Sequence, residues 1–324
     1  TTAAVSAMVA IGSALVAFPA QAFQTKLGDV DVTINSTVSV GTSIRTESQD
    51  LGLIGGNNVN QSGSFGTGRS NTSDDGNLNY AAGDAFSSII KGFHEVTLKK
   101  DNYGFFSRVK WFYDYTLAND NVFHGHEPTN NNINRAGQRV QQPLEDNGFN
   151  PYARFDGINL LDAYGFVNTE IGSMPLDLRV GRQVISWGEG LLLLNPISGL
   201  NTIDVSALRR PGVNLKEAFT PSEMLYGNLG VADNTSLEGF YQLKWRKTVP
   251  EGCGTYFSAN DFASDGCNRL AFAGGLLYDR TRATANPVRI GDGAELNGAA
   301  AAAAAAALRL QLPPINRSLD QQPD

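Results

Sequence analysis

Two histidines and one glutamate lie together in the segment His124-Gly125-His126-Glu127, and imidazole and carboxylate groups are ligands of zinc and copper. Because the histidines are two positions apart, both rings would reach one ion only from an extended backbone. The neighbouring sequence is rich in Asn, which is typical of a solvent-exposed loop. We therefore expect a loop here, and neither a metal site nor a bound cofactor.

Motifs of the common hydrolases and nucleotide-binding enzymes are missing from the sequence. There is no G-x-S-x-G motif, which would place a nucleophilic serine on a strand-to-helix turn. The G-x-x-x-x-G-K-[ST] loop that binds phosphates is also missing. We expect no enzymatic activity, and a lipid or ester hydrolase is the weakest of the functional alternatives.

The chain has 2 cysteines, Cys253 and Cys267, and both lie in one glycine-rich segment. An even number of cysteines in an exported protein favours a disulfide. The alternative is a metal site, which would need two further ligands with suitable spacing. Closing so short a loop would stabilise the fold by roughly 3 kcal/mol in the chain-entropy model.

Charged residues gather where a predicted strand leads into a compact loop. Arg182 and Glu189 lie near the end of the strand, and Asp204, Arg209 and Arg210 follow in the loop. A loop that carries both charge signs could fold inward and constrict a water-filled pore. Alternatively, Arg182 and Glu189 pair within the wall and only hold the loop in place. The sequence leaves both interpretations open.

Strands must position these groups, and the first one is long. Apolar residues occupy only even positions of the segment 30–44, and polar residues fill most odd ones: the apolar residues are Val30, Val32, Ile34, Val38, Val40 and Ile44. Soluble strands usually have about 3–10 residues. A tilted strand that crosses a bilayer needs roughly 9–11 residues in the lipid and extends beyond it. The pattern therefore favours a membrane strand.

Three hairpins with tight turns follow, with strands at 93–100 and 105–117, 160–170 and 176–187, and 224–231 and 236–245. Most aromatic and aliphatic residues of these strands alternate with charged ones, which are Arg108, Lys110, Asp114, Glu238 and Lys244. Lipid cannot satisfy a charge, whereas a water-filled interior can. We therefore expect an all-β fold of about seven strands, a transmembrane antiparallel β-barrel, with these charged residues toward the lumen.

The connections between the hairpins are much longer than the turns within them. They span 46–91, 118–159 and 188–223 and are rich in Asn, Gly, Ser and Asp. Short turns that alternate with long loops are typical of outer-membrane barrels, whose long loops are extracellular. A soluble β-domain is the alternative, but its loop lengths would not be segregated so regularly.

The N-terminus indicates export. Residues 1–22 contain no charged side chain, and an apolar run ends in Ala20-Gln21-Ala22. An apolar segment before an A-x-A site is typical of a signal peptide, which predicts cleavage between Ala22 and Phe23. A buried helix rich in Ala and Val is the alternative. We expect the mature protein in the bacterial outer membrane.

The C-terminal segment 271–324 is expected to be loop and low-complexity tail. An alanine run at 299–307 is followed by Pro313-Pro314 and a polar end. The run is either natural low-complexity sequence or stands for residues of uncertain identity. Because no terminal aromatic strand follows 245, we expect residues 23–270 to be the N-terminal part of a larger barrel.

Composition excludes further classes. The chain holds 35 Gly, 17 Phe and 10 Tyr, which supply turns and a pleated apolar surface. Its net charge is −7, whereas a nucleic-acid-binding surface is normally basic. We therefore expect no nucleic-acid partner.

Five segments of the chain, taken in order, resemble one known family: DDGNLNY at 74–80, GRQVISWGE at 181–189, DVSALRRPG at 204–212, LEGFYQLKWR at 237–246, and CGTYFS at 253–258 with NDF at 260–262. The family is the domain-of-unknown-function family 1302 of exported proteobacterial proteins. The resemblance covers about residues 25–270. It implies an outer-membrane protein that works with a periplasmic lipoprotein-like partner and an inner-membrane efflux-type exporter. It supplies no catalytic residues.

We therefore expect an outer-membrane component of an envelope transport system, for a hydrophobic small molecule or a lipid. A barrel that docks a periplasmic partner without conducting is the second hypothesis. A hydrolase is the third.

Overall fold

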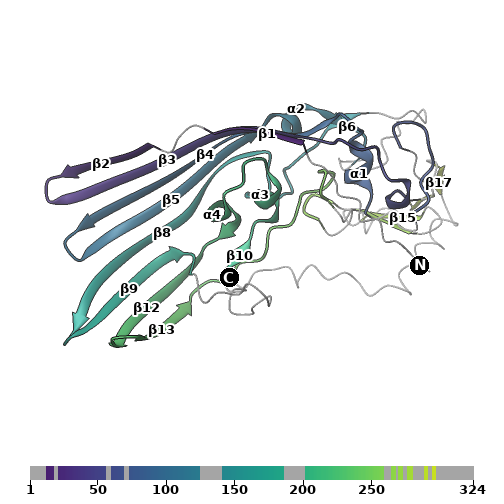
Figure 1. The fold of residues 1–324 in the computed structure, drawn as a ribbon. Coiled ribbons are helices and arrows are strands. Elements are labelled where there is room, and N and C mark those ends of the chain that lie inside the picture. Colours follow the sequence, from purple (N-terminus) through teal and green to yellow (C-terminus); the bar gives the residue numbers. More distant parts are fainter. Residues whose placement is uncertain are drawn as a thin grey trace, which may run out of the picture.

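The computed structural model describes residues 12–17, 21–55, 60–68, 73–124, 141–185, 201–258, 264–267, 269–272, 276–279, 288–290 and 294–296. The largest part of the fold is one antiparallel sheet with nine strands (Figure 1). They are β1 (Gly12–Ala17), β2 (Gln21–Leu27), β3 (Val30–Ile44), β4 (Ala85–Lys100), β5 (Tyr103–Asp114), β8 (Asp156–Ile171), β9 (Met174–Gln183), β12 (Ser222–Ala232) and β13 (Thr235–Gln242). All seven strands expected from the sequence are among them, and the all-β prediction is confirmed.

Neighbours in the sheet follow chain order, β3-β4-β5-β8-β9-β12-β13. At one edge, β1 pairs with the second half of β3 and β2 with its first half. At the other edge, the only partner of β13 among the described strands is β12. The described strands thus form an open, curved sheet, and they do not close into a barrel (Figure 1).

Tight turns connect the strands at one end of the sheet. Two residues separate β4 from β5, β8 from β9, and β12 from β13. Two of these turns contain left-handed backbone, with φ of 51° at Asp101 and 67° at Gly172. The three predicted tight turns are confirmed.

Long connections lie at the other end and carry short elements. These are η1 (Leu51–Leu53), α1 (Asp75–Asn79), α2 (Tyr115–Asn119), β6 (Asn121–Val122), β7 (Gln142–Pro143), β10 (Thr202–Ile203), α3 (Val205–Arg209), α4 (Leu215–Ala218) and β11 (Phe219–Thr220). The expected strand 105–117 is three residues too long, because residues 115–117 belong to α2. It ends at Asp114, whose side chain accepts from Leu117 N and so caps α2.

The two faces of the sheet are the reverse of those in a soluble protein. Val40 pairs with Ile90, and Ile90 pairs with Tyr113. These three apolar side chains are 43%, 40% and 40% exposed, whereas Lys91 and Lys110 on the opposite face are 5% and 3% exposed. We call the first the outer face and the second the inner face. The outer face continues through further exposed residues, which include Leu98, Phe105, Leu160, Val180, Leu225 and Tyr241.

A β-bulge interrupts the pairing of β5 with β8. Ser107 is paired with Ala163 and Val109 with Leu160, so that two residues of β8 stand opposite Arg108. These two residues are Leu161 and Asp162, and both are buried. The bulge therefore brings a carboxylate toward the inner face beside the guanidinium of Arg108.

The main hydrophobic cluster lies under the long loops. It consists of Tyr80, Phe86, Val122, Leu144, Phe149, Phe155, Cys253 and Cys267. The two cysteines form a disulfide, with Cα atoms 5.2 Å apart, as the sequence predicts. Phe149 packs against the backbone of Gly252 and Gly266, where an added Cβ would stand 1.8 Å and 2.3 Å from its ring. Only glycine leaves room for this ring on both sides.

Both ends of the described chain form strands. β1 and β2 include residues 12–17 and 21–22 of the predicted signal peptide, and cleavage between Ala22 and Phe23 stays a prediction. At the other end, a separate sheet contains β14 (Arg269–Phe272), β15 (Leu276–Asp279), β16 (Val288–Ile290) and β17 (Ala294–Leu296). This corrects the expectation that no strand follows 245. The runs 270–272 and 276–278 are apolar and flank a Gly-Gly pair, which is a hairpin pattern.

No helix among the described residues is long and apolar enough to cross a membrane.

Candidate functional site

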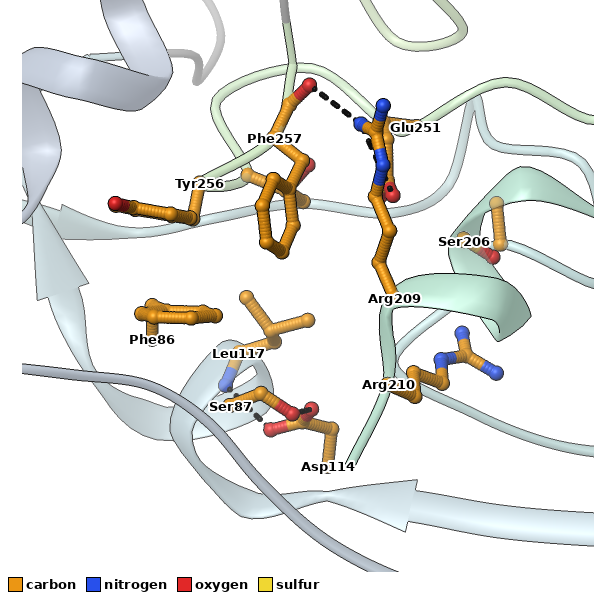
Figure 2. A pocket seen from close by; sticks show the side chains of 12 residues that line it. Phe86, Ser87, Asp114, Leu117, Ser206, Arg209, Arg210, Glu251, Tyr256 and Phe257 are labelled. Carbon is orange, nitrogen blue, oxygen red and sulfur yellow. Dashed lines mark hydrogen bonds and ion pairs between the residues drawn. The ribbon is translucent and has the colours of Figure 1, made fainter. Parts of the chain in front are cut away.

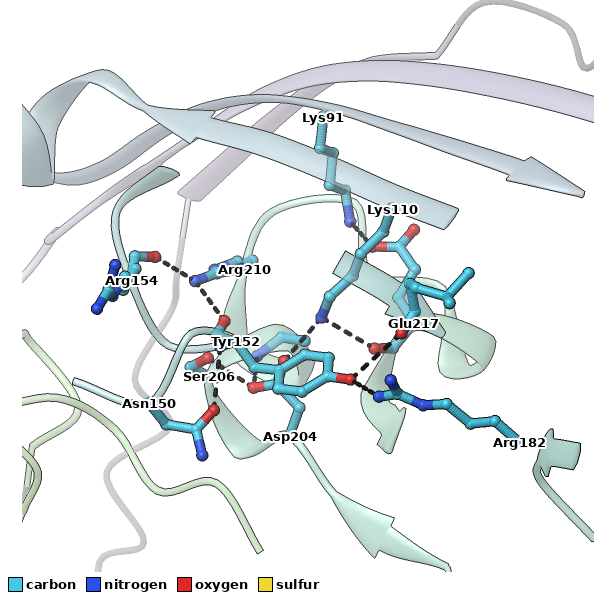
Figure 3. A network of polar contacts seen from close by, with 12 residues as sticks. Lys91, Lys110, Asn150, Tyr152, Arg154, Arg182, Asp204, Ser206, Arg210 and Glu217 are labelled. Atoms are coloured by element: carbon cyan, nitrogen blue, oxygen red, sulfur yellow. Dashed lines mark hydrogen bonds and ion pairs between the residues drawn. The ribbon is translucent and has the colours of Figure 1, made fainter. Parts of the chain in front are cut away.

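The strongest candidate site is the contact between the inner face and residues 201–220, which we call the inner loop. Lys110 Nζ lies 2.8 Å from Asp204 Oδ2, and their side chains are 3% and 1% exposed. Lys91 Nζ lies 2.9 Å from Glu217 Oε2, with side chains 6% and 11% exposed. Two lysines from neighbouring strands therefore hold two carboxylates of the inner loop (Figure 3).

The inner loop is folded so that its carboxylates face the lysines. β10 and β11 pair at its two ends, through Thr202 with Thr220 and Ile203 with Phe219. Asp204 begins α3 and uses Oδ1 to accept from Ala207 N and from the Ser206 hydroxyl. Its other oxygen is left for the ammonium of Lys110. One side chain thus both starts a helix and binds the sheet.

These ion pairs hold the inner loop in place against the inner face. Charges taken out of water need well-placed partners, and removal of one partner leaves the other charge buried and uncompensated. Lys110 has a second acceptor in the carbonyl of Glu217, at 3.3 Å, and its Nζ lies 4.9 Å from the centre of the Tyr152 ring. The carboxylate, the carbonyl and the ring face favour the charged ammonium, whereas the nearby Arg210 guanidinium opposes it.

A second cluster lies on the same face, at the bulge. Arg108 Nη1 donates to Asp162 Oδ2 at 2.7 Å, and its Nε and Nη2 donate to Glu95 Oε1 at 3.0 Å and 2.9 Å. Lys216 of the inner loop also reaches Glu95, at 3.3 Å. The Arg108 guanidinium therefore links three strands, and the inner loop touches this cluster as well.

Two further arginines connect the loops. Arg182, on β9, donates to the Tyr152 hydroxyl. Arg210, directly after α3, donates to the carbonyls of Tyr152 and Arg154 at 3.2 Å and 2.9 Å, and its Cζ lies 3.9 Å from the centre of the Phe112 ring. Burial raises the pKa of the Tyr152 hydroxyl, so that it stays neutral beside Arg182.

A pocket opens next to α3, between the start of β4, the helix α2 and the segment 251–257 (Figure 2). Its walls include Phe86 and Tyr256, whose rings stack with centroids 4.0 Å apart, and Phe257. Its polar lining includes Arg209 and Glu251, whose Nη1 and Oε1 atoms are 3.6 Å apart. Burial raises the pKa of the Glu251 carboxyl to about 7.

Six of the predicted lumen residues lie on or beside the inner face. Arg108, Lys110, Arg182, Asp204 and Arg210 belong to the network, and Asp114 lies at the pocket. Arg209 lines the pocket and donates to the carbonyl of Phe257.

The remaining predicted residues lie elsewhere. Glu238 accepts from the Tyr226 hydroxyl, away from the inner loop. Lys244 is exposed beyond the end of β13, and Glu189 lies outside the described residues. Whether Glu189 pairs with Arg182 therefore stays a prediction, and so does the constriction.

The sequence missed Lys91, Glu95, Asp162, Glu217 and Glu251. The position of Lys91 is predictable from the sequence, because residues two positions apart on a strand share a face and Lys91 stands two positions before Phe93. Lys91 and its partner Glu217 lie far apart in the chain, so no local pattern pairs them.

The described residues contain no group of three potential metal ligands. His124 Nδ1 lies 3.4 Å from Asp75 Oδ1, whereas His126 and Glu127 lie outside the described residues.

Comparison with curated proteins and with solved structures gave no match. A family model does match, over residues 3–319, and its description is "Protein of unknown function (DUF1302)". This match covers nearly the whole chain and includes the strands, the inner loop and the disulfide. The chain is therefore a member of the DUF1302 family.

Proposed function

We propose that the protein is an outer-membrane β-barrel component of an envelope transport system for a hydrophobic small molecule or a lipid. The observation that carries this proposal is the reversal of the two sheet faces. Val40, Ile90 and Tyr113 are exposed on the outer face, while Lys91 and Lys110 are buried on the inner one. Such a sheet suits lipid on its apolar side and a water-filled lumen on its charged side.

A polar group on the outer face supports the same orientation. Trp111 Nε1 donates to His94 Nε2 at 2.9 Å, and His94 Nδ1 lies 2.9 Å from Ser36 Oγ. Each of these side chains finds its partner on a neighbouring strand of the same face. In lipid, where no water is available, polar groups need such internal partners.

In this proposal the inner loop is the constriction. It is held on the charged face by Lys91–Glu217 and Lys110–Asp204, and it therefore narrows the lumen that the barrel would enclose. Substrate passage would require either a path past the loop or its displacement.

Lipid of the outer membrane would contact the outer face. The periplasmic lipoprotein-like partner and the inner-membrane efflux-type exporter are proposed from the family resemblance. Between successive strands the turns at one end have only two residues, so that end offers little surface for a docked protein. This favours transport over a docking role. No catalytic residue is part of the proposal.

Planar-bilayer conductance of the complete protein tests the proposal. We expect a low conductance for the wild type and a higher conductance for the Lys91→Met/Lys110→Met variant. In the variant the inner loop loses both ion pairs that hold it on the inner face. Lys26→Met is the matched control, since its ion pair with Asp31 is exposed, and it should conduct like the wild type. If neither the wild type nor the double variant conducts or takes up an apolar substrate in vesicles, the transport proposal is wrong.

A further inference from the structure

The inner loop contains five charged residues, and all of them have partners outside the loop. The contacts are Asp204 with Lys110, Glu217 with Lys91, Lys216 with Glu95, Arg209 with Glu251 and the Phe257 carbonyl, and Arg210 with the Tyr152 and Arg154 carbonyls. Asn214 is engaged as well, because its side chain accepts from Lys216 N at 3.0 Å and so caps α4. The charges of the loop are therefore held by the protein around it.

The apolar side chains of the loop are placed differently. Four of them are exposed: Ile203 at 36%, Leu208 at 37%, Val213 at 44% and Leu215 at 62%. Because the loop rests on the inner face, with α3 and α4 inside the curve of the sheet, these side chains face the interior and not lipid (Figure 1). Val213 and Leu215 are the most exposed, and we call them the apolar tip. Apolar residues that gather on an exposed surface mark a contact site.

An aromatic row on the wall begins near the apolar tip. Lys216 reaches Glu95 at 3.3 Å, and Glu95 binds the Arg108 guanidinium at 2.9 Å. Arg108 Cζ lies 5.2 Å from the centre of the Phe106 ring, and the centroids of the Phe106 and Tyr164 rings are 5.3 Å apart. Both rings are only partly buried. The row therefore leads from the inner loop across β5 and β8, on the side of the tight turns.

An apolar constriction discriminates between solutes by their hydration. An ion loses its hydration shell there, and no free charge of the inner loop replaces it. A neutral apolar molecule instead leaves water favourably and gains contact with the aliphatic side chains. Pores that select ions place rings of charge at the constriction, whereas here the charged side chains are bound to their neighbours.

We propose that Leu208, Val213 and Leu215 form an apolar gate of the lumen, which admits neutral apolar molecules and excludes ions. The aromatic row is the surface along which such a molecule reaches the gate from the side of the tight turns. This inference rests on the proposed function and deepens it, because it narrows the substrate class to uncharged molecules and assigns that choice to named side chains.

Two matched probes test the substrate class. The complete protein is inserted into asymmetric vesicles with lipopolysaccharide in the outer leaflet, which by themselves admit apolar molecules slowly. The neutral probe is N-phenyl-1-naphthylamine, and the anionic probe is 8-anilinonaphthalene-1-sulfonate, which has the same ring system. The rate at which fluorescence increases measures the entry of each. We expect the wild type to speed up the entry of the neutral probe at least about tenfold more than that of the anionic one.

A double variant assigns the discrimination to the gate. Val213→Thr/Leu215→Asn keeps the size of both side chains and makes them polar. It should slow the entry of the neutral probe about tenfold and increase the planar-bilayer conductance several-fold, because water and ions then enter the constriction. Leu53→Asn is the matched control, since Leu53 is 64% exposed on η1, and it should behave like the wild type. An unchanged unfolding temperature separates a lost gate from a lost fold.

Three results would overturn the gate and leave transport standing. They are equal entry of the two probes through the wild type, wild-type entry and conductance in the folded double variant, or faster entry of the neutral probe in that variant. Absence of both conductance and probe entry, in the wild type and in Lys91→Met/Lys110→Met, would overturn the transport proposal and the gate with it.

Discussion

Lys110 and Asp204 lie 94 positions apart in the chain, and their charged atoms meet at 2.8 Å with both side chains almost fully buried. Lys110 lies on β5, and Asp204 is the N-cap residue of α3. Together with the Lys91–Glu217 ion pair, this contact holds the inner loop against the sheet.

Replacement of Lys110 by Met should destabilise the protein strongly. The methionine fills the space of the aliphatic stem, but Asp204 is left buried with an uncompensated charge. We expect a loss of about 3–5 kcal/mol in the free energy of unfolding, measured by urea titration of the refolded protein in detergent.

The Lys110→Met/Asp204→Asn variant is the control for this effect. Asparagine keeps an oxygen for the α3 cap and removes the charge, so the double variant should recover part of the stability. Equal loss in the single and double variants would show that the pair is not the cause.

The disulfide should stabilise the protein through the loop that it closes. Cys253 and Cys267 are 14 positions apart, so the Cys253→Ser/Cys267→Ser variant should lose roughly 3 kcal/mol. The calorimetric unfolding temperature measures this. Reductant should lower that temperature for the wild type and leave it unchanged for the variant. A reductant effect of equal size on both proteins would rule out this explanation.

Glu251 should make the stability depend on pH. Burial raises its pKa to about 7, whereas the unfolded chain has the ordinary value of 4.5. Between these values the folded protein holds a proton that the unfolded chain has released, so the stability decreases as the pH rises through this window. Arg209 and Arg210 oppose the shift, and Asp204 adds to it.

The Glu251→Gln variant tests this directly, because its side chain does not titrate. The unfolding temperature of the wild type should decrease from pH 5 to about pH 7 relative to that of the variant. A constant difference between the two proteins across this range would show that Glu251 titrates normally.

The long strands could be predicted from the sequence because each keeps its alternation. Apolar and polar residues alternate over most of 30–44, and the structure has a strand with these bounds. The start of β4 was missed, since Ile89 and Ile90 are adjacent and face opposite sides, 1% and 40% exposed. Two neighbouring apolar residues break the pattern of period two.

The candidate site was only partly predictable. The sequence places the charges of Asp204, Arg209 and Arg210 in one compact loop, but the position of this loop depends on lysines from β4 and β5. The bulge that brings Asp162 to Arg108 has no local sequence signal either. Such contacts arise from pairing between distant strands, which periodicity does not encode.

The pair of His94 and Trp111 should contribute to stability on the outer face. His94→Leu leaves the Trp111 indole N–H without its acceptor at 2.9 Å, and we expect a loss of about 1–3 kcal/mol in detergent. His94→Leu/Trp111→Phe removes both polar groups and should restore most of it. A double variant that is less stable than the single one would contradict the account.

Quenching of Trp111 fluorescence by brominated acyl chains measures which face of the sheet contacts lipid. In the complete protein, Trp187, Trp245 and any tryptophan outside these 324 residues are replaced by Phe, so that Trp111 is the single tryptophan, and this variant is reconstituted in vesicles. Phe106→Trp with Trp111→Phe, in the same background, places the probe on the inner face, two positions from Arg108. Lipid on the outer face predicts strong quenching of Trp111 and weak quenching at position 106. Weak quenching at 111, or equal quenching at both positions, would contradict it.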